Sequence, residues 1–239
     1  MVTTPTTEGM VSPVAAPKRA VGGDGLPVSL VDVAARRVRD AILSGTLQPG
    51  DKIVEEQLCA GLGISRAPLR EALRLLGQQG LVEHLPRRGS RVTEWSPQDI
   101  LQLFELRHVL ERHAIEKALP LADVTTALNP VRAALDDMRE ADKRDDDLEK
   151  DDAHRRFHAA VVGLAGNRQL DIAMEPVLLK LQLPMAINLR SEARVHDPSD
   201  GIRRHERILE ALETNDARVA VEAAKNHGQL AYLGLESNN

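Results

Sequence analysis

Two histidines one helical turn apart are the clearest candidates for metal chemistry in this 239-residue chain. His154 and His158 are separated by four positions, and such a pair on a helix offers two imidazole nitrogens to one ion. His205 and His227 each fall on the apolar stripe of a later predicted helix, so we expect them to point inward as well. Four imidazoles suit zinc, nickel, copper or iron, and we expect a divalent transition metal, zinc or nickel. The other histidines are expected to be ordinary surface or core residues: His84, His108, His113 and His196.

An arginine lies on a third apolar stripe. Arg107 falls between Phe104 and Leu110 on the helix predicted to begin at Ser96. A buried arginine is costly without an anion. Two interpretations are open: Arg107 could pair with Glu111, one turn further along, or it could bind the carboxylate of a small-molecule ligand.

A second group of residues has the pattern of a helix that reads DNA. Residues 64–76 read ISRAPLREALRLL. Leucine and alanine recur there at helical spacing, while three arginines repeat every four residues on another face. An arginine on a short helix can pair bidentately with guanine in the major groove. Ser65 is the predicted N-cap of this helix, and we expect DNA contacts from Ser65, Arg66, Ala67, Arg70 and Arg74.

The elements around this helix predict a winged helix-turn-helix. A helix over residues 29–43, with Ser29 and Asp32 as a capping box, precedes a short amphipathic helix at 54–60 and a turn at 61–64. Two short strands, at 81–84 and 90–94, flank the basic turn LPRRG. Basic residues in such a wing contact phosphates or the minor groove, and we assign that role to Arg87, Arg88 and Gly89.

From Ser96 onward the sequence predicts helices only, joined by breaks at 166–167, 197–198 and 215–216. We expect kinks or interruptions at Pro130, Pro176 and Pro184. The fold class is therefore mainly α, a winged helix-turn-helix followed by an antiparallel bundle of about six helices, at approximately 96–119, 121–142, 146–165, 168–194, 199–214 and 216–236.

Composition agrees with a DNA module joined to an acidic partner domain. The net charge is -5, but residues 29–96 hold ten Lys/Arg against eight Asp/Glu, whereas residues 97–239 hold nineteen against twenty-six. The small basic excess suggests two copies of the module on DNA. No apolar run is long enough to cross a bilayer, and the single cysteine excludes an intrachain disulfide. We therefore expect a soluble cytoplasmic protein with no membrane partner.

Four segments resemble the winged-helix domain of GntR-type bacterial transcription regulators: LQPGDKI (47–53), LGISRAPLREAL (62–73), GLV (80–82) and RRGSRV (87–92). The resemblance implies DNA contacts at Arg66, Arg70 and Gly89. In the FadR branch of the family an additional arginine of the second helix helps to bind DNA. Glu56 stands at that position here, which puts that one contact in doubt.

The C-terminal half resembles the ligand-binding FCD domain of the same branch, in the smaller subgroup that is similar to vanillate regulators. The matching segments are FELRHVLE (104–111), RFHA (156–159), GN (166–167), HERILEAL (205–212) and His227. The resemblance implies a metal held by one acid or amide and three histidines. His154 replaces that acid or amide, so the set becomes all nitrogen. It also implies an organic acid bound beside the metal, with Arg107 on its carboxylate.

These observations predict three regions: a flexible tail at 1–28, a winged helix-turn-helix at 29–95, and a metal-binding, effector-binding and dimerisation bundle at 96–239. The expected function is a metabolite-responsive transcription regulator, a repressor that binds double-stranded DNA at a pseudo-palindromic operator as a homodimer. One alternative is a metal-dependent enzyme, because three histidines with an open position can activate water, although no general base is placed beside the cluster. The other is a DNA-binding protein with a purely structural metal.

Overall fold

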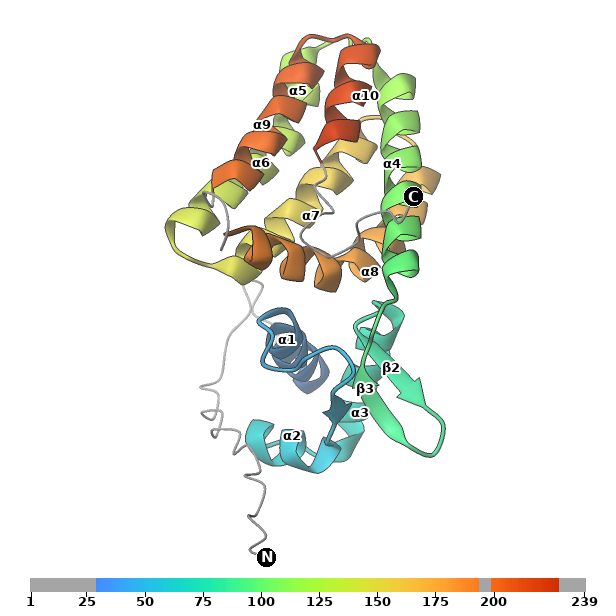
Figure 1. The fold of residues 1–239 in the computed structure, drawn as a ribbon, viewed down its shortest axis with the longest axis vertical. Coiled ribbons are helices and arrows are strands. Elements are labelled where there is room, and N and C mark those ends of the chain that lie inside the picture. The colour runs from blue at the N-terminus through green and yellow to red at the C-terminus, as the bar shows by residue number, and fades with distance from the viewer. Residues whose placement is uncertain (1–28, 194–198, 228–239) are drawn as a thin grey trace, which may run out of the picture.

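The computed structural model describes residues 29–193 and 199–227. An N-terminal unit of helices and a small sheet lies at one end of the molecule, and a helical bundle forms the other (Figure 1). The elements of the N-terminal unit are α1 (Leu30–Leu43), β1 (Lys52–Ile53), α2 (Glu55–Leu62), α3 (Arg66–Gln78), β2 (Val82–Leu85) and β3 (Gly89–Val92).

The predicted winged helix-turn-helix is confirmed, with one additional strand. β2 and β3 pair antiparallel, with Val82 opposite Val92 and Leu85 opposite Gly89, and β1 joins the free edge of β3 to give the order β1-β3-β2. β1 is too short to show a period in the sequence, so only its partner strand reveals it. Gly89 begins β3 with a φ of 89°, a backbone conformation that favours glycine at the end of the wing turn.

The helix caps differ in part from the predictions. The Ser29 side chain accepts a hydrogen bond from the Val31 N–H, so Ser29 caps α1, but the reciprocal bond expected from Asp32 is not formed within the described structure. Ser65 occupies the N-cap position of α3, and its side chain makes no capping hydrogen bond. The hydroxyl of Ser65 is therefore available to other partners. Ser96 and Asp99 form the complete capping box that their spacing predicts.

The bundle contains α4 (Pro97–Ala118), α5 (Val124–Ala127), α6 (Asn129–Lys143), α7 (Asp147–Gly163), α8 (Arg168–Ala193), α9 (Ser199–Glu213) and α10 (Ala217–Asn226). The helix predicted at 121–142 is two helices. Pro130 lies in the first turn of α6, where its missing N–H costs little and its ring prevents the helix from continuing backward. The predicted last helix is described as far as Asn226, and its expected end at 236 lies outside the described residues.

Of the two outcomes expected at Pro176 and Pro184, a kink or an interruption, the interruption does not occur, because α8 runs through both. Its buried residues Met174, Val177 and Leu181 pack into the bundle core, and this packing favours the helix over its full length despite two lost backbone hydrogen bonds. No helix in the described ranges combines the length and apolarity that a bilayer crossing requires.

The two halves of the molecule share one helix. The core of the N-terminal unit is built from α1, α2, α3 and the sheet, and it also includes Leu183 and Ala186 of α8. Gly80, with a φ of 74°, lies so close to α8 that a Cβ atom there would be 2.8 Å from Lys180 Cγ. α8 is therefore part of the bundle and also packs against the winged unit (Figure 1).

Candidate metal centre and DNA-binding surface

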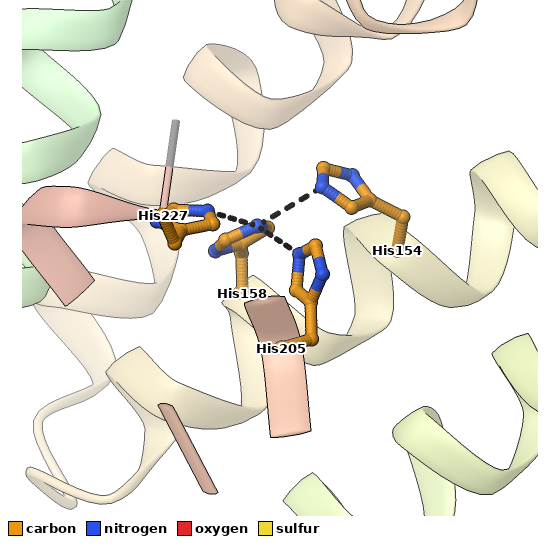
Figure 2. Close-up of side chains that lie close together, drawn as sticks. All are labelled: His154, His158, His205 and His227. Carbon is orange, nitrogen blue, oxygen red and sulfur yellow. Dashed lines mark hydrogen bonds between the residues drawn. The ribbon is translucent and has the colours of Figure 1, made fainter. Parts of the chain in front are cut away.

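Three helices of the bundle bring the four predicted histidines together. His154 and His158 lie on α7, His205 lies on α9, and His227 follows the last residue of α10 (Figure 2). All four side chains are buried, and one ligand atom from each lies within 4.8 Å of the others. The buried face of α7 carries these two histidines together with apolar residues such as Phe157.

Three nitrogen–nitrogen distances match those between ligands of a single ion. His158 Nε2 lies 3.2 Å from Nε2 of His154, 3.4 Å from Nε2 of His205 and 3.3 Å from Nε2 of His227. Adjacent nitrogens around an ion bound at about 2.0–2.1 Å are roughly 3.0–3.4 Å apart. The spacing around His158 is therefore the spacing that a shared transition metal requires.

Hydrogen bonds on the far side of three rings fix their tautomers. His158 Nδ1 lies 2.6 Å from Glu111 Oε1, His205 Nδ1 lies 2.7 Å from the Gly201 carbonyl oxygen, and His227 Nδ1 lies 2.6 Å from that of Ala224. These oxygens can only accept, so each Nδ1 carries the proton and each neutral ring directs an Nε2 lone pair at the centre. Three converging lone pairs cannot bond to one another, and a cation between them satisfies all three.

Burial keeps these imidazoles in the neutral form that metal binding requires. It lowers the pKa of His154, His158 and His227 well below the usual histidine value, and the positive charge of Arg107 adds to the effect. Burial also lowers the pKa of His205 to about 4, although its bond to the Gly201 carbonyl opposes this shift. At neutral pH, protons therefore do not compete for the four nitrogens.

Arg107 and Glu111 lie beside the four histidines on α4. Arg107 is 4% exposed, with its Nη2 3.3 Å from His227 Nε2 and its Nε 3.7 Å from Glu111 Oε1. The ion-pair interpretation of Arg107 is thus present in the structure, but the contact is long and the buried Nε has no hydrogen-bond partner. The sequence did not predict the hydrogen bond between Glu111 and His158. Its only signal about Glu111 was the i, i+4 spacing from Arg107, which suggested an ion pair instead.

α7 also connects the histidines to the winged unit. Asp152, two residues before His154, accepts hydrogen bonds from both terminal nitrogens of Arg39 on α1, and the Nη1–Oδ2 distance is 3.2 Å. Arg39 Nε also donates to Gln182 Oε1 on α8 at 3.4 Å. Leu148, at the start of α7, packs against the core of the winged unit. A movement of α7 therefore reaches α1 directly.

The predicted DNA-binding residues lie on α3, at its N-cap and in the wing. α3 buries its apolar face and exposes Ser65, Arg66, Ala67, Arg70 and Arg74. In the wing, Arg87 and Arg88 are exposed and Gly89 is half-buried. Glu56 is exposed at the start of α2, at the position where an arginine was expected from the resemblance.

Two arginines of α3 are already paired within the winged unit. Arg70 Nε donates to Glu55 Oε2 at 2.9 Å. Arg74 uses Nε and Nη2 to contact Glu71, with an Nη2–Oε1 distance of 2.7 Å. Sequence reasoning missed Glu55, because it is 15 residues from Arg70 and only the turn between α2 and α3 brings the two together.

The remaining histidines agree with their assignment outside the metal cluster where the structure describes them. His84 Nδ1 lies 2.8 Å from Ser90 Oγ across β2 and β3. His108 is half-buried and His113 is exposed on α4. His196 lies outside the described residues.

Family models cover both halves of the chain. The model for bacterial regulatory proteins of the gntR family matches residues 30–92, and the model for the FCD domain matches residues 102–230. The second match alone spans more than half of the chain. The two matches correspond to the winged unit and to the bundle that holds the histidines.

Relatives that align with most of this chain are named as transcription regulators. An uncharacterized HTH-type transcriptional regulator of Bacillus subtilis is 30% identical over 192 residues, covering 80% of this chain and 82% of its own. A probable D-xylose utilization operon repressor of Paenarthrobacter nicotinovorans is 30% identical over 203 residues, covering 83% and 87%. Among solved structures, a GntR regulator of Rhodococcus sp. RHA1 is 29% identical, with a TM-score of 0.69 and coverage of 86% and 96%.

Proposed function

The chain belongs to the GntR family of bacterial regulatory proteins and carries an FCD domain, and from this we propose that it is a repressor whose DNA binding depends on a metal and a small carboxylate. The family and its relatives are transcription regulators rather than enzymes. Relatives named as repressors of D-xylose and gluconate operons support the direction of control. In this proposal two copies of the chain bind a pseudo-palindromic operator, one winged unit on each half-site.

The proposed metal ligands are His154, His158, His205 and His227. The observation that supports this most directly is the set of three Nε2 lone pairs that Nδ1 hydrogen bonds direct to one point. An all-imidazole set favours zinc or nickel over magnesium or calcium, which prefer oxygen ligands. When bound, the metal supplies a positive centre to which an anionic ligand can attach.

The proposed effector is a small organic acid held between the metal and Arg107. In the described structure the Arg107 Nη2 hydrogen bond goes to His227 Nε2, which a metal would also use. Metal binding therefore takes an acceptor from a buried guanidinium and places a second cation near it. A carboxylate between the metal and Arg107 would place a negative charge beside both cations. It would also accept two parallel hydrogen bonds from the Arg107 guanidinium, which is the geometry that arginine favours.

The proposed route to DNA is α7. Its two histidines face the metal, while Asp152 and Leu148 contact the winged unit. Effector binding that shifts α7 would move α1 through the Asp152–Arg39 pair and alter the separation of the two winged units in a dimer. Because half-sites must match the helical repeat of DNA, a shift of a few ångströms changes operator affinity.

The experiment is a titration of operator affinity in the presence of metal and candidate acids. An operator is first selected from a randomised duplex library, and its affinity is then measured with chelator, with zinc or nickel, and with metal plus gluconate. Glucose is the uncharged control for gluconate, and further small carboxylates extend the series. We expect one carboxylate to weaken operator binding only when metal is present.

Arg107→Ala provides the matched protein control. It should retain metal, since arginine offers no lone pair, retain DNA binding, and lose the response to the acid. If no carboxylate alters DNA affinity and metal removal only unfolds the bundle, the metal is structural and the proposed sensing role is wrong.

A further inference from the structure

Two exposed arginines of α3 differ in the carboxylate that contacts each guanidinium: Glu55 of α2 contacts Arg70, and Glu71 of α3 contacts Arg74. An arginine reads guanine with two parallel N–H donors directed at O6 and N7. Arg70 donates to Glu55 through Nε alone, so its Nη1 and Nη2 edge carries no contact from the described part of the chain. Arg74 uses Nε and Nη2 on Glu71, an exposed neighbour on the same helix, and its outer Nη1 and Nη2 edge also remains available.

Glu55 contacts the Nε of Arg70 on the side of the guanidinium that faces the protein. Glu55 is the first residue of α2, and its side chain is 20% exposed, whereas the Arg70 side chain is 64% exposed. The carboxylate is thus partly fixed against the protein while the guanidinium projects outward. An arginine loses several rotatable degrees of freedom when it binds a base, and a contact that fixes the side chain beforehand reduces this loss.

We propose that Glu55 is a positioning residue that reaches Arg70 from a different helix and orients it to read guanine. The proposal rests on the proposed DNA-binding function and assigns specificity within its surface. Glu55 also places a negative charge close to the DNA phosphates. Its carboxylate therefore weakens binding to every sequence while it favours the one geometry in which Arg70 meets guanine.

Glu56 supplies a matched control. It is the adjacent carboxylate in the first turn of α2 and is exposed, and no described contact joins it to Arg70. Glu55→Ala and Glu56→Ala each remove one negative charge from the same helix start, so electrostatic effects on non-specific binding should be similar. Only Glu55→Ala removes the contact to Nε.

The test uses an operator selected by the wild-type protein from a randomised duplex library. Each guanine of one half-site is then replaced in turn, and the affinity of every duplex is measured at one fixed salt concentration. Arg70→Ala identifies the base pair that Arg70 reads, as the position where the variant no longer distinguishes guanine from its replacement. Thermal unfolding of every variant checks that the fold is retained.

We expect Glu55→Ala to reduce discrimination at the Arg70 base pair by roughly three- to tenfold, with non-specific affinity unchanged or raised. Glu56→Ala should leave that discrimination intact. If Glu55→Ala lowers thermal stability, Glu55→Gln is used, which keeps a weaker acceptor for Nε and should give a smaller loss of discrimination.

Unchanged discrimination in a folded Glu55 variant would overturn the positioning role, while leaving DNA binding by α3 intact. If Arg70→Ala affects no base pair, the base-reading premise itself is wrong, which distinguishes failure of the proposed function from failure of the positioning role.

Discussion

Replacing Glu111 by glutamine tests whether the carboxylate behind His158 supports metal binding. Glu111 is 1% exposed and its Oε1 lies 2.6 Å from His158 Nδ1. A hydrogen bond to a charged group contributes about 1.5–3 kcal/mol and one between neutral groups about 0.5–1.5 kcal/mol. Glutamine keeps the acceptor and loses the charge, so Glu111→Gln should weaken metal binding by roughly 1–1.5 kcal/mol, which is about tenfold.

A second effect acts in the same direction. The Glu111 carboxylate lies 3.7 Å from Arg107 Nε and offsets its charge, so its removal leaves Arg107 to repel the metal. The loss should therefore fall in the range of about 10- to 100-fold that is typical for partners of metal-bound histidines. The assay is a competition titration of zinc and of nickel against a chelator of known affinity, at neutral pH.

Glu116→Gln is the control, because Glu116 is an exposed carboxylate on the same helix α4 and the charge change is identical. It should bind metal as the wild type does. If Glu111→Gln also binds metal with unchanged affinity in a folded protein, the carboxylate does not orient His158 and the reasoning is refuted.

Three further predictions concern the metal centre, DNA and pH. His158→Ala combined with His205→Ala should abolish the metal, expected at about one ion per chain after dialysis, because two imidazoles retain a divalent ion poorly; full metal content by elemental analysis would show that the cluster is not the site. Arg66→Ala should cost about 1–3 kcal/mol at the operator, whereas Arg87→Ala should weaken all sequences and flatten the salt dependence; equal losses on operator and random duplex would contradict a base-reading role for Arg66. The metal-free protein should lose stability as pH falls below about 6.5, by up to roughly 1.4 kcal/mol per pH unit for each buried histidine, because the unfolded chain takes up protons that the folded one excludes; thermal unfolding that does not change between pH 7 and 5 would contradict it.

Local sequence signals were sufficient for the elements and for the inward direction of the key residues. Helical periodicity placed His154 and His158 on one face, and it placed Arg107 on an apolar stripe, where the structure buries it. The serine at the start of α4 predicted a capping box that the structure contains. These features depend on neighbours within about one helical turn, which is the range over which a sequence pattern carries direct information.

Local signals failed where distant packing decided the outcome. Pro176 and Pro184 remain inside α8 because the bundle core holds that helix together. β1 consists of two residues and exists only through its pairing with β3. The capping bond predicted for Ser65 is not formed, since an N-cap residue type is permissive and the geometry of the preceding turn decides whether the bond is made.

The sequence by itself determined the two-part architecture, the row of arginines on α3 and the four histidines, because each follows from residue type and short-range spacing. Only the tertiary structure decided that the four Nε2 atoms converge, that Glu111 orients His158, that Glu55 holds Arg70, and that Asp152 joins α7 to α1. Apart from the His154–His158 pair, these contacts link residues that are 15 to 113 positions apart. Their geometry depends on how helices cross and on which side-chain conformations the packed core allows, and no local pattern of residues records either.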